Sequence, residues 1–307
     1  MIRPRRLRRG DRMAVVAPAS PFSREEFDAG IAEIARLGFE PVFDDTVFAR
    51  DGYVAGTASI RAAAVRRALR DESIAALISV RGGYGSAQLL PLLDPAEVRA
   101  GRKPVIGYSD ITTLLAWVTG TCGVVSFHGP MLEARLARGE QGYDRDTFLR
   151  ALCDAEPLGP LAPPTLEVVR PGEFAGPLLG GTVTQLLASM GTPWAFDPPH
   201  GYVLFFDEVA ERPYRLDRMI TQLRQSGLLA RAGAVVFGEL PRCDEPSGNP
   251  TARATVARLM GDFRGPVLIG FPSGHAAHPV VTLPFGVRAR VVADAPPRLI
   301  IEEPAVQ

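Results

Sequence analysis

The sequence predicts an α/β protein that begins with a doubly wound, parallel sheet. In the first half, short apolar runs typical of buried strands alternate with segments whose apolar residues have helical spacing. A proline-rich segment at 154–175 follows, after which the apolar runs are shorter. We therefore expect an N-terminal α/β domain at 1–153, a linker at 154–175 and a smaller, β-rich C-terminal domain at 176–307.

The elements of the first half are predicted one by one from these patterns. Ser23 and Glu26 form a capping box, and apolar residues at helical spacing then continue to Gly38. Further helices are expected over 60–69 and 111–119. Five apolar runs are the expected strands: 13–17, 41–43, 75–80, 104–107 and 124–127. Because helices separate these strands, parallel pairing is predicted.

The second half contains one clear helix between apolar runs. The helix is predicted to begin at Pro213, a residue that suits the first helical position, and to end near Gly227. The expected strands are 203–206, 234–237, 267–269 and 287–292.

Composition excludes several classes of function. Of the 307 residues, 34 are Lys or Arg and 34 are Asp or Glu, so the formal net charge is zero. A general electrostatic attraction to nucleic acid or to anionic lipid is therefore not expected. The three cysteines, Cys122, Cys153 and Cys243, are far apart, which favours neither a disulfide framework nor a zinc ribbon. The basic N-terminus precedes an apolar run too short for a signal peptide, so we expect a cytoplasmic protein without membrane attachment.

Three loops of the first half are candidates for a binding site. They are 17–20, 81–85 and 107–110, and each follows a predicted strand. In open α/β sheets, ligands bind at the carboxyl ends of the strands, so these loops are expected to meet at one edge. The segment 81–85 contains three glycines, whose backbone N–H groups could approach an oxyanion. A tight turn with positive φ explains the same glycines equally well.

Ser109 is the sharpest candidate for a nucleophile. It lies between the strand predicted at 104–107 and the helix that follows, an arrangement similar to a nucleophile elbow, which exposes a hydroxyl near helix N-terminal amides. The match is partial, because Ile111 stands where the usual elbow has a small residue. Ser109 could instead cap the helix, although Asp110 is an equally good cap. From spacing alone, both interpretations stay open.

A serine nucleophile needs a base, and the sequence offers four histidines. His275 is the preferred candidate because it lies in a Gly/Pro loop directly after an apolar strand. His278 suggests a zinc pair with it, but no carboxylate or cysteine completes such a site. His128 is interpreted as a core or substrate-binding residue, and His200 as a surface residue.

The base needs an acidic partner that orients it. Asp207 and Glu208 end an apolar strand, and neighbouring strand residues point to opposite faces. Only one of the two carboxylates can therefore face His275. The chain order of the resulting triad is serine, acid, histidine.

Taken together, these residues resemble the LD-carboxypeptidases, serine peptidases that include murein tetrapeptide carboxypeptidases and microcin C immunity peptidases. The resemblance extends over nearly the whole chain, and its segments run in the family's order. They are VVAPAS, RGGYGSAQLLPLLD, PVIGYSDITTLL, FHGPML, GPLLGGTVTQLLASMGTPW, VLFFDEVAERPYRLDRMITQL and GFPSGHAAHPVVTLPFG.

The resemblance implies a role for each site residue. Ser109 would be the nucleophile and His275 the general base. The family's usual Glu falls at Asp207, so Asp207 is the preferred acid and Glu208 the rival. The oxyanion hole would consist of the backbone N–H of Asp110 and one from the turn at 82–83. The implied substrate-shaping residues are Arg81 and Tyr84, and the implied turn residues are Gly82 and Gly83.

The resemblance also implies fold, substrate and assembly. The fold would be a flavodoxin-like N-terminal domain with a smaller β-rich C-terminal domain, and the active site would lie between them. The substrate would be a cytoplasmic muropeptide tetrapeptide that loses its terminal D-Ala during peptidoglycan recycling. No metal or organic cofactor would be required, and the protein would be a homodimer. Alternatives are hydrolysis of a peptidyl-nucleotide antibiotic, which needs aromatic stacking from Trp117 or Trp194, non-catalytic muropeptide binding, and metal-dependent hydrolysis.

Overall fold

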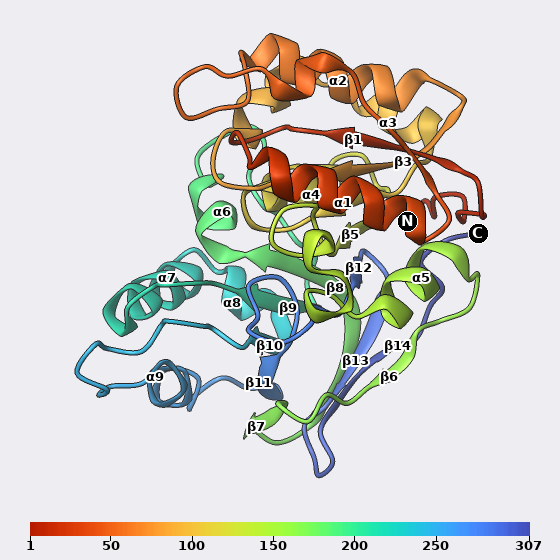
Figure 1. Ribbon diagram of the computed structural model, residues 1–307. Helices are drawn as coiled ribbons and strands as arrows, with labels where there is room; N and C mark the ends of the chain where they lie inside the picture. Colours follow the sequence, from red (N-terminus) through yellow and green to blue (C-terminus); the bar gives the residue numbers. More distant parts are fainter.

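Two sheets form the framework of the protein in the computed structural model, which describes residues 1–307 (Figure 1). The first sheet has the strand order β12-β5-β4-β3-β1-β2. Its five N-terminal strands pair in parallel: β1 (Arg12–Val16), β2 (Glu40–Val42), β3 (Ile74–Ser79), β4 (Val105–Gly107) and β5 (Ser126–His128). The order 2-1-3-4-5 is that of flavodoxin-like folds, which confirms the fold prediction.

Alternating side chains of β1 explain why helices cover both faces of this sheet. Met13 and Val15 belong to the same apolar cluster as the buried side of α1 (Arg24–Arg36). Ala14 and Val16 belong to another cluster, with residues of α2 (Ala58–Arg70), α3 (Pro95–Gly101) and α4 (Thr112–Gly120). A parallel strand buried on both faces requires this arrangement. The short 3₁₀ helices of this half are η1 (Asp45–Phe48), η2 (Ser86–Leu92), η3 (Ser109–Ile111) and η4 (Leu136–Gln141), and α5 (Arg145–Cys153) follows them.

The second sheet has eight strands in the order β6-β14-β13-β8-β9-β10-β11-β7. Its centre is parallel and consists of β8 (Glu173–Thr182), β9 (Tyr202–Asp207), β10 (Ala232–Gly238) and β11 (Val267–Phe271). Antiparallel strands flank it: β6 (Gly159–Leu161), β7 (Glu167–Arg170), β13 (Arg288–Val292) and β14 (Arg298–Ile301). The remaining helices are α6 (Val183–Ala188), α7 (Pro213–Gln225), α8 (Leu228–Arg231) and α9 (Ala252–Leu259). They bury one face of this sheet.

The segment predicted as a linker, 154–175, differs from that expectation because it contributes strands to the second sheet. β6 and β7 lie in it and form the two outer edges of the sheet. Proline lacks an N–H and is tolerated on edge strands, so Pro160 can occupy β6. The prolines that suggested an unstructured connection are therefore compatible with strands at these positions.

The two halves of the chain share a sheet and an apolar cluster, which the sequence did not predict. β12 (Leu283–Phe285) comes from the C-terminal half but pairs with β5 in the first sheet. One apolar cluster of 45 residues includes Val15 of β1 and Phe205 of β9. The chain ends also meet, because the Gln307 amide donates to Pro4 O. None of the helices combines the length and the apolar character needed to cross a membrane.

Candidate active site

Ser109 lies at a strained turn between β4 and α4. Its φ is +62°, a left-handed conformation that is unusual for a residue other than glycine. Neither η3 nor α4 has a side-chain cap, so the Ser109 hydroxyl does not cap the helix. Asp110 does not cap it either, because its carboxylate accepts a hydrogen bond from the Ser86 amide at 2.8 Å. Of the two interpretations left open by the sequence, the backbone geometry favours the nucleophile elbow.

A continuous hydrogen-bonded chain links Ser109, His275 and Asp207. The His275 Nε2 atom is 3.1 Å from Ser109 Oγ, and its Nδ1 atom is 2.8 Å from Asp207 Oδ2. The His275 amide also donates to Asp207 Oδ1 at 3.0 Å, which fixes the loop to the carboxylate. Ser109 follows a strand of the first sheet, whereas Asp207 ends β9 and His275 follows β11 of the second. The serine and histidine expected from opposite halves of the chain therefore meet.

Asp207 is the last residue of β9, and Glu208, which follows the strand, makes different contacts. Asp207 is fully buried, and its Oδ2 atom also accepts a hydrogen bond from the Thr182 hydroxyl at 3.0 Å. Glu208 accepts from the Thr184 amide at 2.5 Å instead and makes no hydrogen bond to His275. The geometry thus places the preferred carboxylate, Asp207, against the imidazole.

The pKa values of this group follow from burial and from the ion pair. Burial alone works to lower the pKa of His275, but the charge and hydrogen bond of Asp207 outweigh it and the pKa is raised. Burial works to raise the pKa of Asp207, yet the charge and hydrogen bond of His275 keep it lowered. Burial raises the pKa of Glu208 to about 7, against the hydrogen bond from Thr184. Asp207 therefore stays ionised at neutral pH and stabilises the protonated imidazole.

The glycine turn that follows β3 lies directly beside Ser109. A Cβ on Gly82 would be 2.8 Å from Ser109 Cβ and 3.2 Å from the Asp110 amide nitrogen, so only glycine fits there. The backbone N–H groups of Gly82 and Gly83 donate to no other group of the protein. Donors of this kind next to a nucleophile are suited to an oxyanion.

Arg81 and Tyr84, the implied substrate-shaping residues, have different surroundings. Arg81 forms an ion pair with Glu133 at 2.9 Å and donates to Pro21 O. Tyr84 is half exposed, and its ring packs edge to face against Tyr53 with 5.5 Å between the centroids. Tyr84 is thus available at the surface, whereas the Arg81 charge is already paired.

None of the other histidines forms a hydrogen bond with a triad residue. His278 Nδ1 is 2.6 Å from Glu239 Oε1, so His275 and His278 contact different carboxylates and do not form a pair. His128 is fully buried and neither ring nitrogen has a hydrogen-bond partner. Burial lowers the pKa of His128 to about 4, so the ring is neutral. His200 is exposed, as expected.

Gly274 allows a test of this geometry by one added methyl group. Its φ is +68°, and a Cβ would be 2.5 Å from Asp207 Oδ2 and 2.6 Å from His128 Nε2. We expect Gly274→Ala to displace the His275 loop and to lower kcat about 100-fold. The control is Gly227→Ala, which has φ +79° and open space around the new Cβ, so it carries similar backbone strain without the collision. Equal activity of the two variants in a hydrolysis assay would contradict this account.

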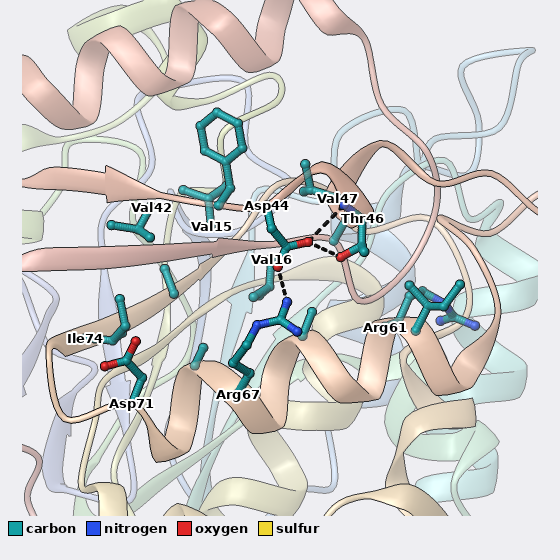
Figure 2. Close-up of a pocket in the computed structure, with 16 residues that line it drawn as sticks. Val15, Val16, Val42, Asp44, Thr46, Val47, Arg61, Arg67, Asp71 and Ile74 are labelled. Atoms are coloured by element: carbon teal, nitrogen blue, oxygen red, sulfur yellow. Dashed lines mark hydrogen bonds and ion pairs between the residues drawn. The ribbon is translucent and has the colours of Figure 1, made fainter.

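A separate cavity of about 190 Å³ lies between β1, β2 and α2, away from the triad (Figure 2). Its walls are mainly apolar, and Val15 and Val47 line it. Three of its polar residues bind one another, because Asp44 accepts hydrogen bonds from the Thr46 amide and from Arg67. None of the triad residues lines this cavity, so it is not part of the candidate active site.

Two contacts of the site were missed by sequence reasoning. Thr182 binds Asp207, and the Tyr108 ring packs edge to face against His275 with 5.0 Å between the centroids. Tyr108 precedes Ser109, so its proximity to the nucleophile could be predicted from the sequence. Its contact with the second sheet could not. Thr182 ends β8, and no local spacing relates it to β9.

Comparisons with known proteins identify the family of this chain. The family model described as the LD-carboxypeptidase N-terminal domain matches residues 13–129, and that of the LD-carboxypeptidase C-terminal domain matches residues 175–291. A relative from Streptomyces coelicolor is 35% identical and covers 100% of this chain and 98% of its own. The murein tetrapeptide carboxypeptidase of Pseudomonas aeruginosa is 30% identical over 87% of this chain and 88% of its own.

Solved structures resemble the whole fold. The muramoyltetrapeptide carboxypeptidase of Oxalobacter formigenes has a TM-score of 0.84 and 28% identity, over 95% of this chain and 99% of its own. The microcin C7 self-immunity protein MccF, known from Escherichia coli, was solved in complex with aspartyl sulfamoyl adenosine. That structure has a TM-score of 0.91 and 23% identity, over 100% of both chains.

Proposed function

Because this chain belongs to the LD-carboxypeptidase family of peptidases, we propose that it is a serine carboxypeptidase that releases terminal D-Ala from muropeptide tetrapeptides. The observation that carries the proposal is the hydrogen-bonded chain from Ser109 through His275 to Asp207. Nucleophile, base and acid in this order are the arrangement of a serine hydrolase. The likeness to murein tetrapeptide carboxypeptidases supports the substrate class.

The geometry suits acyl transfer to water. His275 Nε2 takes the proton of the Ser109 hydroxyl as the oxygen attacks the peptide carbonyl. Asp207 stabilises the imidazolium, and the amide of Asp110 together with that of Gly82 or Gly83 would stabilise the oxyanion. His275 then gives its proton to the leaving amine of D-Ala. Water, activated by the same imidazole, hydrolyses the acyl-enzyme and restores the hydroxyl.

The proposed scissile bond joins the L-centre of a diamino acid to a terminal D-Ala. The D-centre places its methyl group where a pocket for L-peptides accommodates hydrogen, so ordinary proteases do not accept it. As parts of the same proposal, the enzyme acts in cytoplasmic peptidoglycan recycling, requires no cofactor and is a homodimer. These parts rest on the family resemblance.

The direct test is release of D-Ala from a purified peptidoglycan tetrapeptide. The control substrate is the same peptide with terminal L-Ala, which separates LD-specificity from general peptidase activity. We expect D-Ala from the first peptide and little or no alanine from the second. Equal cleavage of both peptides would contradict the LD-specificity, and cleavage of neither would contradict the substrate assignment.

The pH dependence of kcat/KM tests the role of His275 independently. The base must be neutral to accept the serine proton, so activity should be low at acidic pH and rise through the pKa of His275. Because Asp207 raises that pKa, we expect the midpoint above the ordinary histidine value of about 6.5. A midpoint well below that value, measured with the tetrapeptide, would contradict the ion pair as the dominant influence.

A second candidate is hydrolysis of a peptidyl-nucleotide antibiotic by the same triad. The likeness to MccF, which was solved in complex with aspartyl sulfamoyl adenosine, supports it. A cavity of about 400 Å³ lined by Trp194, Phe196 and Trp117 offers aromatic rings, but none of the triad residues lines it. Trp117 is buried in the core, whereas Trp194 is partly exposed and could stack on a base. Parallel assays with an aminoacyl sulfamoyl adenosine and the tetrapeptide, on the wild type and on Trp194→Ala, would separate the two substrates. Cleavage of the nucleotide substrate alone would favour this candidate.

A further inference from the structure

Arg135 is a buried arginine that contacts both halves of the candidate active site. Its side chain precedes η4 and is 9% exposed. One terminal nitrogen, Nη2, donates to Gly274 O at 2.7 Å and to Ala276 O at 2.9 Å. Those carbonyls belong to the residues on either side of His275. The Nε atom donates to the Tyr108 hydroxyl at 3.3 Å, and Tyr108 directly precedes Ser109.

The guanidinium has no carboxylate partner, although a buried charge is costly without one. Its remaining hydrogen bond is a long one from Nη1 to Gly142 O at 3.5 Å, and its Cζ atom lies 5.7 Å from the centroid of the Tyr108 ring. The desolvation of Arg135 is therefore offset mainly by carbonyl and hydroxyl groups that adjoin His275 and Ser109. These partners connect the guanidinium both to the loop that carries His275 and to the residue that precedes Ser109.

The backbone that carries Arg135 is anchored on the first sheet. The Leu132 and Glu133 amides donate to Ser79 O and Val80 O, at the end of β3. The carbonyls that Arg135 binds, in contrast, lie in the loop after β11 of the second sheet. Arg135 thus bridges the sheet that supplies the nucleophile and the sheet that supplies the base.

We propose that Arg135 is a positioning residue that holds the His275 loop against the nucleophile turn, so that the imidazole stays within reach of the Ser109 hydroxyl. This inference rests on the proposed function. Misplacement of a reacting group by about 1 Å can cost about 100-fold in rate, which sets the expected size of the effect.

The charge of Arg135 provides a signature that a merely structural residue would lack. Four charged or titratable groups act on the imidazole from the surrounding elements, namely Asp207, Glu208, Arg135 and the neutral His128, and the Tyr108 ring packs against it. The positive charge of Arg135 works against Asp207 and lowers the pKa of His275. The acidic limb of the pH profile is the range in which kcat/KM rises as His275 loses its proton. Removal of the Arg135 charge should therefore move this acidic limb to higher pH.

The experiment compares Arg135→Met, which removes both the guanidinium hydrogen bonds and the charge, with Arg135→Lys, which keeps the charge but lacks the guanidinium. We expect Arg135→Met to lower kcat for D-Ala release about 100-fold with little change in KM and to shift the acidic limb upward. Arg135→Lys should lower kcat but keep the limb near its wild-type position. Guanidinium ions added at millimolar concentration should partly restore Arg135→Met.

The control is Arg150→Met, because Arg150 also donates to a backbone carbonyl, that of Leu158 at 2.8 Å, but pairs with Asp146 and makes no hydrogen bond to the triad. Thermal unfolding of every variant separates folding from positioning. Equal rates and equal pH limbs for Arg135→Met and Arg150→Met would overturn the proposal.

The rate at which a fluorophosphonate labels Ser109 provides a second readout that needs no peptide substrate. If the wild type is labelled but releases no D-Ala, the substrate assignment fails while the Arg135 test remains valid. Labelling of Arg135→Met at the wild-type rate would overturn the positioning role in that case too.

Discussion

Ser109→Ala is expected to lower kcat/KM for D-Ala release by about 10⁴-fold to 10⁶-fold. Alanine lacks the oxygen that forms the acyl-enzyme, and the hydrogen bond to His275 Nε2 disappears with it. What remains is binding and oxyanion stabilisation, which alone give only a small residual rate. The measurement is steady-state release of D-Ala from the tetrapeptide, with single-turnover assays for the slow variant.

The fold should survive this substitution, which makes the loss interpretable. Ser109 caps no helix, and its hydroxyl contributes only the contact with His275. The control is Ser247→Ala in an exposed loop, where the hydroxyl binds only Asn249 O, and activity should be unchanged. Retention of more than about a tenth of the wild-type activity in Ser109→Ala would exclude a serine nucleophile at this position.

Asp207→Asn is the second large effect, with an expected loss of about 10⁴-fold in kcat. The carboxylate accepts hydrogen bonds from His275 Nδ1, from the His275 amide and from the Thr182 hydroxyl. An amide has one acceptor oxygen, so it cannot satisfy these donors, and it favours the wrong imidazole tautomer. It also removes the charge that stabilises the imidazolium. The raised pKa of His275 should fall in this variant, because burial would then act unopposed by Asp207.

Glu208→Gln is the matched control, since the two carboxylates are adjacent in sequence and both are buried. Glu208 binds the Thr184 amide rather than the imidazole, and glutamine can keep that hydrogen bond. We expect a loss of less than about tenfold in kcat and a small downward shift of the acidic limb, because the Glu208 charge helps to raise the pKa of His275. A greater loss in Glu208→Gln than in Asp207→Asn would reverse the assignment of the acid.

Much of the fold could be predicted from local patterns. The apolar run at 203–206 lies within β9, as predicted, and α7 begins at Pro213, the predicted first residue of that helix. Five strands of the structure were not predicted: β6, β7, β8, β12 and β14. For β6, β7 and β12 the reason is physical. Each is three or four residues long, and its pairing partner lies far away in the sequence. Strands of this kind are stabilised by the edge that they join and carry little local signal.

In the candidate site too, residues with a local sequence signal could be predicted, whereas contacts between distant segments could not. Ser109 and His275 were found because each lies in a recognisable turn beside a strand. Alternation along β9 required that Asp207 and Glu208 face opposite ways, but only the packing of β8 on β9 decides which side meets the imidazole. Arg135 and Thr182 act through contacts between segments distant in sequence, which no motif reports.

In the proposed mechanism, the Ser109 hydroxyl of the first sheet is activated by His275 of the second. A fluorophosphonate followed by peptide mapping in a mass spectrometer tests it most directly. We expect one adduct per chain, on the peptide that contains Ser109, formed faster as pH rises through the pKa of His275 and strongly reduced in His275→Ala. An adduct on a different residue, or labelling of Ser109 that does not depend on His275, would contradict it.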